Sequence, residues 1–269
     1  MNRKLQNLEE ILARMESVLI AYSGGTDSTL LLKIAKDTLG EKVLAVTANS
    51  PTYSSEEMKA AEKMAKTLAA KHLIIETQEL ADPNFVTNPP DRCFHCKQEL
   101  FRKLGAIAKE RDLNYVLDGS NYDDLSDFRP GMRAGQELGV RSPLKEAMLT
   151  KEDIRKFSKE LGLPTWDKPS LACLASRFPY GTMITEEVLV KLDKAERFIK
   201  GLKIAQVRVR HHGTLARIEV LKEDLSVLVQ RRDEIVRTFK DLGYTYVTVD
   251  LQGYRTGSMN ETLERSDAG

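Results

Sequence analysis

The stretch that decides the fold is Val18-Leu19-Ile20-Ala21-Tyr22-Ser23-Gly24-Gly25-Thr26-Asp27-Ser28. The apolar run 18–22 predicts a buried strand, and the pattern Thr29-Leu30-Leu31-Leu32-Lys33-Ile34-Ala35 behind it predicts a helix. The paired glycines between them allow backbone N–H groups to approach an oxyanion closely, and a helix N-terminus favours negative charge. The stretch therefore predicts a phosphate site where a strand runs into a helix.

The side chains of this turn suit a nucleotide. The hydroxyls of Ser23 and Ser28 can donate to phosphate oxygens, and the Asp27 carboxylate can hold Mg²⁺ beside them. No Gly-Lys-Ser/Thr follows, so the turn is not the Walker loop that cradles a transferred γ-phosphate. Residues 23–28 resemble the PP-loop of ATP pyrophosphatases, and this resemblance implies an ATP site formed by Ser23, Gly24, Gly25, Asp27 and Ser28; the alternative is an ordinary Gly-Gly turn.

The composition excludes several classes of protein. Charged residues make up 30% of the 269 residues and balance to a net charge of +1, which gives no sign of a nucleic-acid partner. The chain has no apolar run long enough to span a membrane, and residues 1–4 lead into an amphipathic helix. We expect a cytoplasmic protein without a membrane partner.

Alternating strand and helix patterns in the first half predict an α/β fold, a Rossmann-like parallel sheet with helices on both faces. The predicted strands are 18–22, 43–48, 72–76 and 115–118, and the predicted helices are 3–16, 28–39, 54–70, 97–111 and 151–161. Because the carboxyl ends of parallel strands converge on one crevice, the segments 23–28, 48–50 and 118–121 should lie close together.

Beyond a segment rich in Pro, Gly and Ser at 164–182, a smaller α/β unit is predicted. Its predicted elements are a helix at 185–200, strands at 205–210 and 215–220, a helix at 222–241 and a strand at 244–250. We expect two domains, 1–180 and 181–269.

The three cysteines are the second chemical feature. Cys93-Phe94-His95-Cys96 is expected in a loop after Pro89-Pro90, and Cys173 lies far along the chain. Three interpretations compete: a zinc site completed by His211 or His212, a redox dithiol that leaves Cys173 unexplained, and a [4Fe–4S] cluster held by three cysteines with one iron open to sulfide. Three cysteines do not suggest a disulfide framework.

Several stretches together resemble the LarE family of sulfur transferases, PP-loop ATP pyrophosphatases that build the nickel-pincer nucleotide cofactor of lactate racemase. The stretches are Ala21–Thr29, Asp118-Gly119-Ser120-Asn121, Asp127-Phe128-Arg129-Pro130-Gly131, Ser176-Arg177-Phe178-Pro179-Tyr180-Gly181-Thr182, Val207-Arg208-Val209-Arg210-His211 and Gly253-Tyr254-Arg255-Thr256-Gly257. The first is shared by many PP-loop enzymes, whereas the Arg-Phe-Pro-Tyr-Gly and Arg-Val-Arg stretches are specific.

The resemblance implies a reaction. The N-terminal domain would adenylate a carboxylate of pyridinium-3,5-biscarboxylic acid mononucleotide, sulfur would displace AMP, and the cycle would repeat on the second carboxylate. Asp27 and Cys173 are the implied catalytic residues, in a homo-oligomer supplied by an unidentified sulfide donor.

Two sulfur sources occur in the family. In one branch the cysteine before Arg-Phe-Pro-Tyr-Gly gives up its own sulfur and ends as dehydroalanine. In the other, three cysteines bind a [4Fe–4S] cluster that carries the sulfide. We favour the cluster held by Cys93, Cys96 and Cys173, with sacrificial Cys173 as the alternative. Thiolation of tRNA by a similar cluster enzyme is the second alternative function.

The substrate's phosphate requires cations. Arg208 and Arg210 lie two apart on a predicted strand, so both guanidiniums face one side and can bind one phosphate. We add Arg177 and Arg255 to this set, and we expect Tyr180 to stack on the pyridinium ring. Glu196 is expected on a solvated helix surface.

Overall fold

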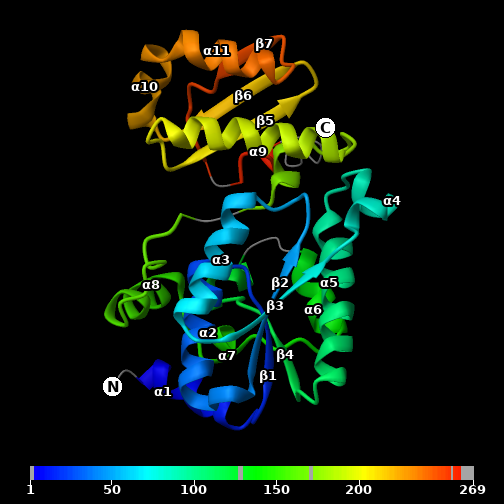
Figure 1. The fold of residues 1–269 in the computed structure, drawn as a ribbon, viewed down its shortest axis with the longest axis vertical. Coiled ribbons are helices and arrows are strands. Elements are labelled where there is room, and N and C mark those ends of the chain that lie inside the picture. Colours follow the sequence, from blue (N-terminus) through cyan, green and yellow to red (C-terminus); the bar gives the residue numbers. More distant parts are fainter. Residues whose placement is uncertain (1–2, 127–129, 170–171, 256, 262–269) are drawn as a thin grey trace. The chain divides into compact units, whose positions relative to one another are not determined.

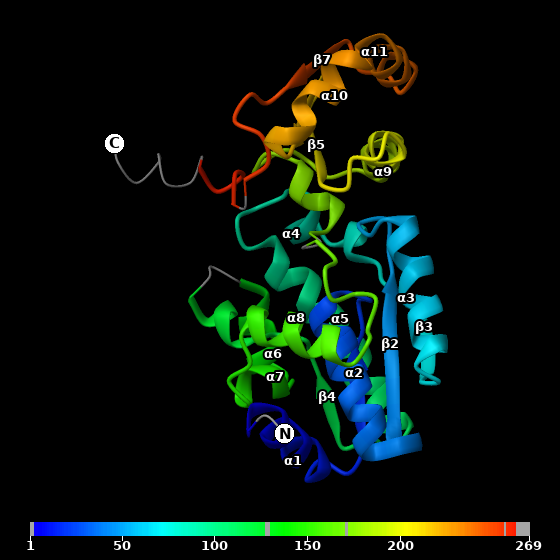
Figure 2. The ribbon, with the colours of Figure 1, turned by 90° about the vertical axis from the view of Figure 1, so that its left-hand side faces the viewer.

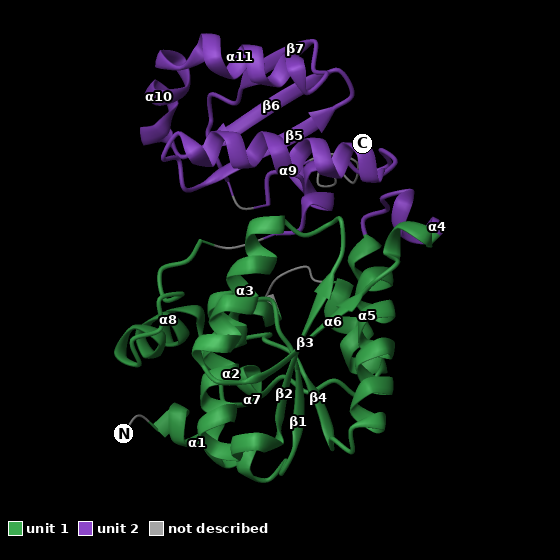
Figure 3. Cartoon of the chain, in the orientation of Figure 1, with its two compact units in different colours: residues 1–82, 91–171 green, residues 83–90, 172–269 purple. Residues whose placement is uncertain are grey.

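In a computed structural model, the structure describes residues 3–126, 130–169, 172–255 and 257–261. The chain divides into two compact units (Figure 3). The first contains residues 1–82 and 91–171, and the second contains 83–90 and 172–269. The division thus falls at 171/172, not near 180, and the second unit includes a short segment from the first half of the chain.

The first unit is built on a four-stranded parallel sheet in the order β3-β2-β1-β4, as the alternating pattern predicted. The strands are β1 (Val18–Ala21), β2 (Val43–Asn49), β3 (Lys71–Glu76) and β4 (Tyr115–Leu117). Ile20 of β1 pairs with Ala45 on one side and Leu117 on the other. β1 reads as an unbroken apolar run because helices bury it on both faces.

Helices cover both faces of this sheet, which confirms the predicted architecture (Figures 1 and 2). One face packs against α1 (Arg3–Ala13), α2 (Thr26–Leu39), α3 (Ser55–Thr67), α7 (Pro143–Glu146) and α8 (Lys151–Glu160). The other face packs against α5 (Arg92–Glu110) and α6 (Pro130–Glu137). Short 3₁₀ turns are η1 (Gly40–Lys42), η2 (Glu79–Ala81) and η3 (Tyr122–Ser126).

The cysteine pair lies in a helix, and the expectation of a loop was wrong. α5 begins at Arg92, five residues before the predicted start, so Cys93 and Cys96 belong to its first turns. The physical reason is Phe94, which is buried and begins the apolar stripe that continues through Phe101 and Leu104. The helix therefore extends as far upstream as its buried face does.

The second unit is a three-stranded sheet, β5 (Val207–His212), β6 (Leu215–Val220) and β7 (Tyr246–Val249), with β5–β6 antiparallel and β6–β7 parallel. Its helical elements are α4 (Pro83–Val86), η4 (Leu174–Arg177), α9 (Glu186–Gly201), η5 (Lys222–Asp224), α10 (Leu225–Gln230) and α11 (Arg232–Asp241). The single helix predicted at 222–241 is broken at Arg231, whose φ of −100° and ψ of 16° interrupt the helix. Within the described residues, no helix combines the length and apolarity of a membrane span.

Candidate nucleotide pocket and buried arginine network

The turn at the end of β1 lies against α3. Gly24 has a φ of +69°, and a Cβ added there would lie 2.7 Å from the Cβ of Ala61. Both the backbone conformation and the close approach require glycine. This glycine therefore sets the path of the loop as well as opening it to a ligand.

The hydroxyls of the turn and the start of α2 face one another. Ser23 Oγ lies 3.1 Å from Ser28 Oγ, and the Gly25 N–H donates to Ser23 Oγ at 3.4 Å. Gly25 is the N-cap of α2, and no side chain caps this helix, whereas Thr150 caps α8. An uncapped helix start of this kind suits a phosphate.

The segment after β4 contacts the same turn, as the predicted crevice requires. A Cβ added to Gly119 would lie 3.2 Å from the backbone nitrogen of Ser28. Asp118 next to it accepts hydrogen bonds from Ser120 Oγ and Ser142 Oγ, both at 2.7 Å. Hydroxyl groups therefore fix the Asp118 carboxylate at the base of the turn.

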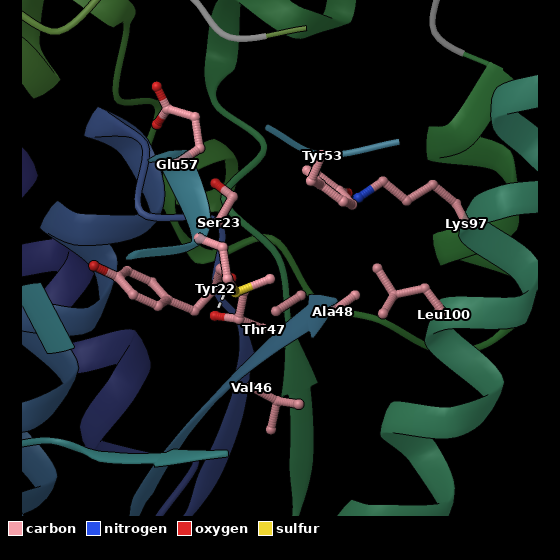
Figure 4. A pocket seen from close by; sticks show the side chains of 11 residues that line it. Tyr22, Ser23, Val46, Thr47, Ala48, Tyr53, Glu57, Lys97 and Leu100 are labelled. Carbon is pink, nitrogen blue, oxygen red and sulfur yellow. Dashed lines mark hydrogen bonds between the residues drawn. The ribbon is translucent and has the colours of Figure 1, made fainter. Parts of the chain in front are cut away.

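A pocket opens beside the turn (Figure 4). Its walls come from the ends of β1 and β2, from α3 and from α5, and mostly apolar groups line it. The polar side chains on its wall include Ser23, Tyr53, Glu57 and Lys97. An apolar pocket with few polar groups, adjoining a phosphate-binding turn, suits the base and ribose of a nucleotide.

The cysteine helix forms one wall of this pocket. Lys97 and Leu100 of α5 line it, and Figure 4 shows the amino group of Lys97 pointing toward Tyr53. Cys93 and Cys96 precede these two residues by four positions each, so they lie on the same helix face. Cys93 is exposed and Cys96 half-buried, and none of the three cysteines forms a disulfide.

The cysteine pair meets the basic requirement of a cluster or metal site. Two thiols one helical turn apart can ligate one centre, and the exposure of Cys93 gives that centre access. Cys173 belongs to the second unit. Among the residues that the structure describes, no three His, Cys, Asp or Glu side chains gather as a ready metal-ion site.

Sequence reasoning missed Lys168. Its ammonium donates to the carbonyl oxygen of Gly24 at 3.0 Å and forms an ion pair with Glu57 at 2.5 Å. The loop contains no lysine, unlike the Walker loop, and a polyphosphate site needs cations. The missing lysine was the signal that sequence reasoning could have used. Because Lys168 lies 144 positions from Gly24, only the fold identifies it.

Arg177 is bound to protein groups in the second unit. Its guanidinium makes two 2.8 Å hydrogen bonds to the Glu196 carboxylate, and it donates to the carbonyl oxygen of Cys173 at 3.0 Å. In this arrangement Arg177 holds the backbone of Cys173.

The expectation that Glu196 is solvated was wrong, since only 4% of it is exposed. Burial favours a higher pKa for Glu196, but the charge and hydrogen bonds of Arg177 outweigh this and lower the pKa below its usual value. Glu196 lies on the buried face of α9, where the Arg177 guanidinium pairs with its carboxylate.

Arg208 and Arg210 lie on β5, and both are buried. Arg210 donates to Glu219 at 2.6 Å and to Ser258 Oγ at 2.9 Å. Arg208 donates to the Val207 carbonyl at 2.8 Å and stacks on the ring of Tyr254. Burial, followed by the charge of Arg177, lowers the pKa of Arg208 to about 10.

The arginine network consists of Arg177, Arg208 and Arg210 with Glu196 and Glu219, and all five side chains are buried. Burying cations is costly, and an anion bound to the network would reduce that cost.

Two further predicted residues, Tyr180 and Arg255, lie nearer the surface than the arginine network. The Tyr180 hydroxyl donates to Asn260 at 3.0 Å, and Arg255 donates to Glu261 at 3.0 Å. His211, a possible zinc ligand, is buried between Phe178 and Tyr244. The motif residues Asp127, Phe128, Arg129 and Thr256 lie outside the described residues.

Comparisons with known proteins agree with this geometry. The model of the argininosuccinate synthase N-terminal HUP domain matches residues 17–88, which include the turn and most of the pocket. An uncharacterised protein of Synechocystis is 46% identical over 97% of this chain and 98% of its own length. An uncharacterised protein of Methanocaldococcus jannaschii is 33% identical over 94% of this chain and 96% of its own.

A third relative has a named activity. Pyridinium-3,5-bisthiocarboxylic acid mononucleotide synthase of Lactiplantibacillus plantarum is 38% identical over 98% of this chain and 96% of its own length. Such identity across nearly the whole of both chains shows common family membership, and the nucleotide turn and the HUP-domain match agree with it. This chain is an enzyme of the LarE family of PP-loop ATP pyrophosphatases.

Proposed function

We propose that this enzyme uses ATP to convert the carboxylates of pyridinium-3,5-biscarboxylic acid mononucleotide into thiocarboxylates. The family relative with a named activity supports the product class. One observation carries the proposal: the face of α5 that lines the pocket beside the turn also bears two thiols. An activated acid and a sulfur carrier would therefore work beside each other.

The first step is activation of the acid. A carboxylate oxygen attacks the α-phosphorus of ATP, the bond to pyrophosphate breaks, and an acyl adenylate forms. Ser23, Ser28 and the N–H groups at the start of α2 would bind the departing pyrophosphate, and Asp27 would hold Mg²⁺. These groups stabilise negative charge that builds up on the phosphates.

The second step is transfer of sulfur. Sulfide attacks the acyl carbon, the bond to AMP breaks, and the thiocarboxylate and AMP leave. The thiolates of Cys93, Cys96 and Cys173 would hold a [4Fe–4S] cluster, which when bound would supply the sulfide. The hydrogen bond from Arg177 to the Cys173 carbonyl would keep the third thiolate in place.

The arginine network would take the substrate's phosphate. Burial lowers the pKa of Arg208 to about 10, and a dianionic phosphate bound beside that guanidinium would raise it again. Arg255 and Tyr180 would contact the rest of the mononucleotide from the neighbouring loop.

Anaerobic purification followed by iron analysis and product assay tests the proposal. We expect about four irons per chain, pyrophosphate release that requires both ATP and the dicarboxylate, and a thiocarboxylate product. Asp27→Asn should abolish pyrophosphate release, whereas Cys93→Ala should retain it and stop sulfur transfer. Pyrophosphate release that depends on tRNA and not on the mononucleotide would contradict the proposal in favour of tRNA thiolation.

Sacrificial transfer from Cys173 is the second candidate, favoured by the incomplete burial of this residue and by the hydrogen bond from Arg177 to its carbonyl oxygen. Mass spectrometry after one turnover separates the two routes. Loss of one H₂S from the chain, located at Cys173, together with no bound iron, would support the sacrificial route. An unchanged chain mass over several turnovers supports the cluster.

A further inference from the structure

The carboxylate of Glu79 is buried at the carboxyl ends of two neighbouring strands. Ser50 and Thr52 follow the end of β2, and Glu79 begins η2 shortly after β3 ends. The exposed fractions of Ser50, Thr52 and Glu79 are 5%, 1% and 2%. All three residues are therefore closed off from bulk water.

Three oxygens of these residues contact one another. Ser50 Oγ donates to Glu79 Oε1, and Thr52 Oγ1 donates to the same oxygen at 2.9 Å. The two hydroxyl oxygens lie 2.9 Å apart, and the Thr52 N–H donates to Ser50 Oγ at 3.0 Å. Each hydroxyl carries one proton, and both protons point at the carboxylate. The contact between the two hydroxyls therefore has no proton of its own, and lone pairs face each other there.

The second oxygen of this carboxylate lacks a protein partner. Glu79 Oε2 is buried, and no group of the described residues donates a hydrogen bond to it. Within the same part of the chain, no lysine, arginine or histidine forms an ion pair with Glu79. A buried charge is normally paired or bound to a metal ion, and an unmatched buried polar atom can mark an ion. Glu79 thus requires a positive charge that the described side chains do not supply.

A proton would meet only part of this requirement. It would neutralise Glu79 but leave Oε2 either as an unmatched acceptor or as an unmatched donor. A cation in contact with the carboxylate would neutralise the charge, satisfy Oε2 and also bind lone pairs of the two hydroxyls. A single carboxylate balances a single positive charge, and Mg²⁺ demands a more complete octahedral set of oxygens. These donors therefore suit a monovalent cation.

We propose that Glu79, Ser50 and Thr52 form a binding site for a monovalent cation such as K⁺. The cation would stabilise the turn between β2 and α3. The Tyr53 N–H in this turn donates to the Ser50 carbonyl at 3.0 Å, and the Tyr53 side chain lines the pocket (Figure 4). We therefore expect the bound cation to favour nucleotide binding as well. That effect on nucleotide affinity rests on the proposed function, whereas the cation site itself does not.

Thermal melts of the full chain in K⁺, Na⁺ and choline chloride at equal ionic strength test the proposal. Choline is too large for this buried site, so it gives the stability of the protein without its cation. We expect K⁺ to raise the Tm by roughly 5 °C relative to choline. Glu79→Gln keeps the shape of the side chain but removes its charge, and it should abolish this difference. Thr52→Val removes one of the oxygens and should reduce it.

Asp153→Asn is the matched control. The Asp153 carboxylate already pairs with the Lys4 ammonium at 2.6 Å, so it needs no other cation. This variant should lose stability equally in every salt and keep the full difference between K⁺ and choline. An equal response to K⁺ in Glu79→Gln and Asp153→Asn would overturn the proposal.

A crystal of the unchanged protein grown in Rb⁺ tests the site directly, even if the variants fail to fold. We expect anomalous scattering from Rb⁺ beside Glu79 Oε2. A water in that position, or the same Tm in K⁺ and choline, would overturn the cation site in favour of a protonated Glu79.

Calorimetry separates this site from the ATP assignment. K⁺ should tighten the binding of the α,β-methylene analogue of ATP severalfold in the unchanged protein. A Tm that depends on K⁺ in a protein that does not bind the analogue would overturn the ATP assignment and leave the cation site standing. Binding of the analogue with the same affinity in K⁺ and choline would refute only the link between the cation and the pocket.

Discussion

Gly24 has a structural role in addition to the phosphate-binding role that the sequence predicts. The positive φ of Gly24 disfavours any side chain. Independently, a Cβ added at Gly24 would lie only 2.7 Å from the Cβ of Ala61. Sequence reasoning assigned this glycine to phosphate binding alone. The structure adds that it sets the contact between the loop and α3.

Gly24→Ala should therefore cost more than a left-handed alanine alone. We expect a loss of about 2–4 kcal/mol in the free energy of unfolding, from backbone strain plus overpacking, together with at least a tenfold loss of ATP affinity. Gly162→Ala is the control, since Gly162 has a φ of +68° with nothing within 4 Å. It should cost about 1 kcal/mol by urea unfolding and leave ATP binding intact. Equal losses in the two variants would refute the packing argument.

Arg208 carries an energetic cost that a ligand can remove. Burial lowers the pKa of Arg208 to about 10 in the folded chain, below its value in the unfolded chain, so the contribution of Arg208 to stability rises with pH above about 10. Below pH 10 the buried charge is a constant cost. Arg208→Met should therefore not lower the free energy of unfolding at pH 7.

The same variant should lose any thermal stabilisation by inorganic phosphate, which we expect in the unchanged protein. Arg210→Met is the contrast, because it removes the closest partner of Glu219, a fully buried carboxylate. We expect that variant to lose about 3–5 kcal/mol. Thermal melts with and without phosphate measure both effects, and equal destabilisation of the two variants would argue against a net cost of burying the Arg208 charge.

At the scale of elements, the starts of α2 and α5 carry the predicted chemistry. α2 begins without a side-chain cap, and α5 carries its cysteines in the first turns. α8 differs from α2, because a complete capping box at Thr150 and Asp153 satisfies its first N–H groups. A cap would satisfy the N–H groups that a phosphate needs.

Gly25→Asp tests the uncapped start of α2. Gly25 has the extended backbone of an N-cap, with φ of −78° and ψ of 172°, so a carboxylate there would cap the helix. We expect a gain of a few tenths of a kcal/mol in stability without nucleotide and at least a tenfold loss of ATP affinity. Gly25→Ser adds a cap without charge and should lose less affinity in calorimetry. Unchanged ATP binding in Gly25→Asp would place the phosphates elsewhere.

At the scale of the whole molecule, the second unit is discontinuous. Its segment 83–90 comes from the first half of the chain, and Asn88 is fully buried within it. The Asn88 side chain donates to the Pro179 carbonyl at 2.7 Å, and the backbone carbonyl of Asn88 accepts from Gly181 N–H at 2.9 Å. The Arg-Phe-Pro-Tyr-Gly stretch is thus held by residues that precede the cysteine helix.

We expect Asn88→Ala to destabilise the second unit by about 2–4 kcal/mol, through the lost hydrogen bonds and the φ of +56° at this position. Asn88→Gly relieves the strain and should recover about 1 kcal/mol. ATP binding by the first unit should be unchanged in both, as calorimetry can show. A loss of ATP binding equal to the loss of stability would contradict independent units.

The sequence by itself determined the parallel sheet, the helices on its two faces, the glycine turn after β1 and the family. These features depend on local periodicity and on short motifs, in which neighbouring residues act together. Residues 18–28 alone specify a buried strand, a glycine turn and a helix start. Sequence reasoning failed where packing decides the local structure. At the start of α5, burial of Phe94 extends the helix over the cysteines.

Only the tertiary structure decided which distant residues share a site. Lys168 contacts a loop 144 positions away, Glu196 is buried because Arg177 reaches it from η4, and residues 83–90 join the second unit. Each depends on a contact between segments far apart in the chain, and no local pattern encodes such a contact. The long-range contacts also explain why the predicted phosphate-binding arginines are buried among carboxylates, since a charge can be buried only where the fold supplies its partner.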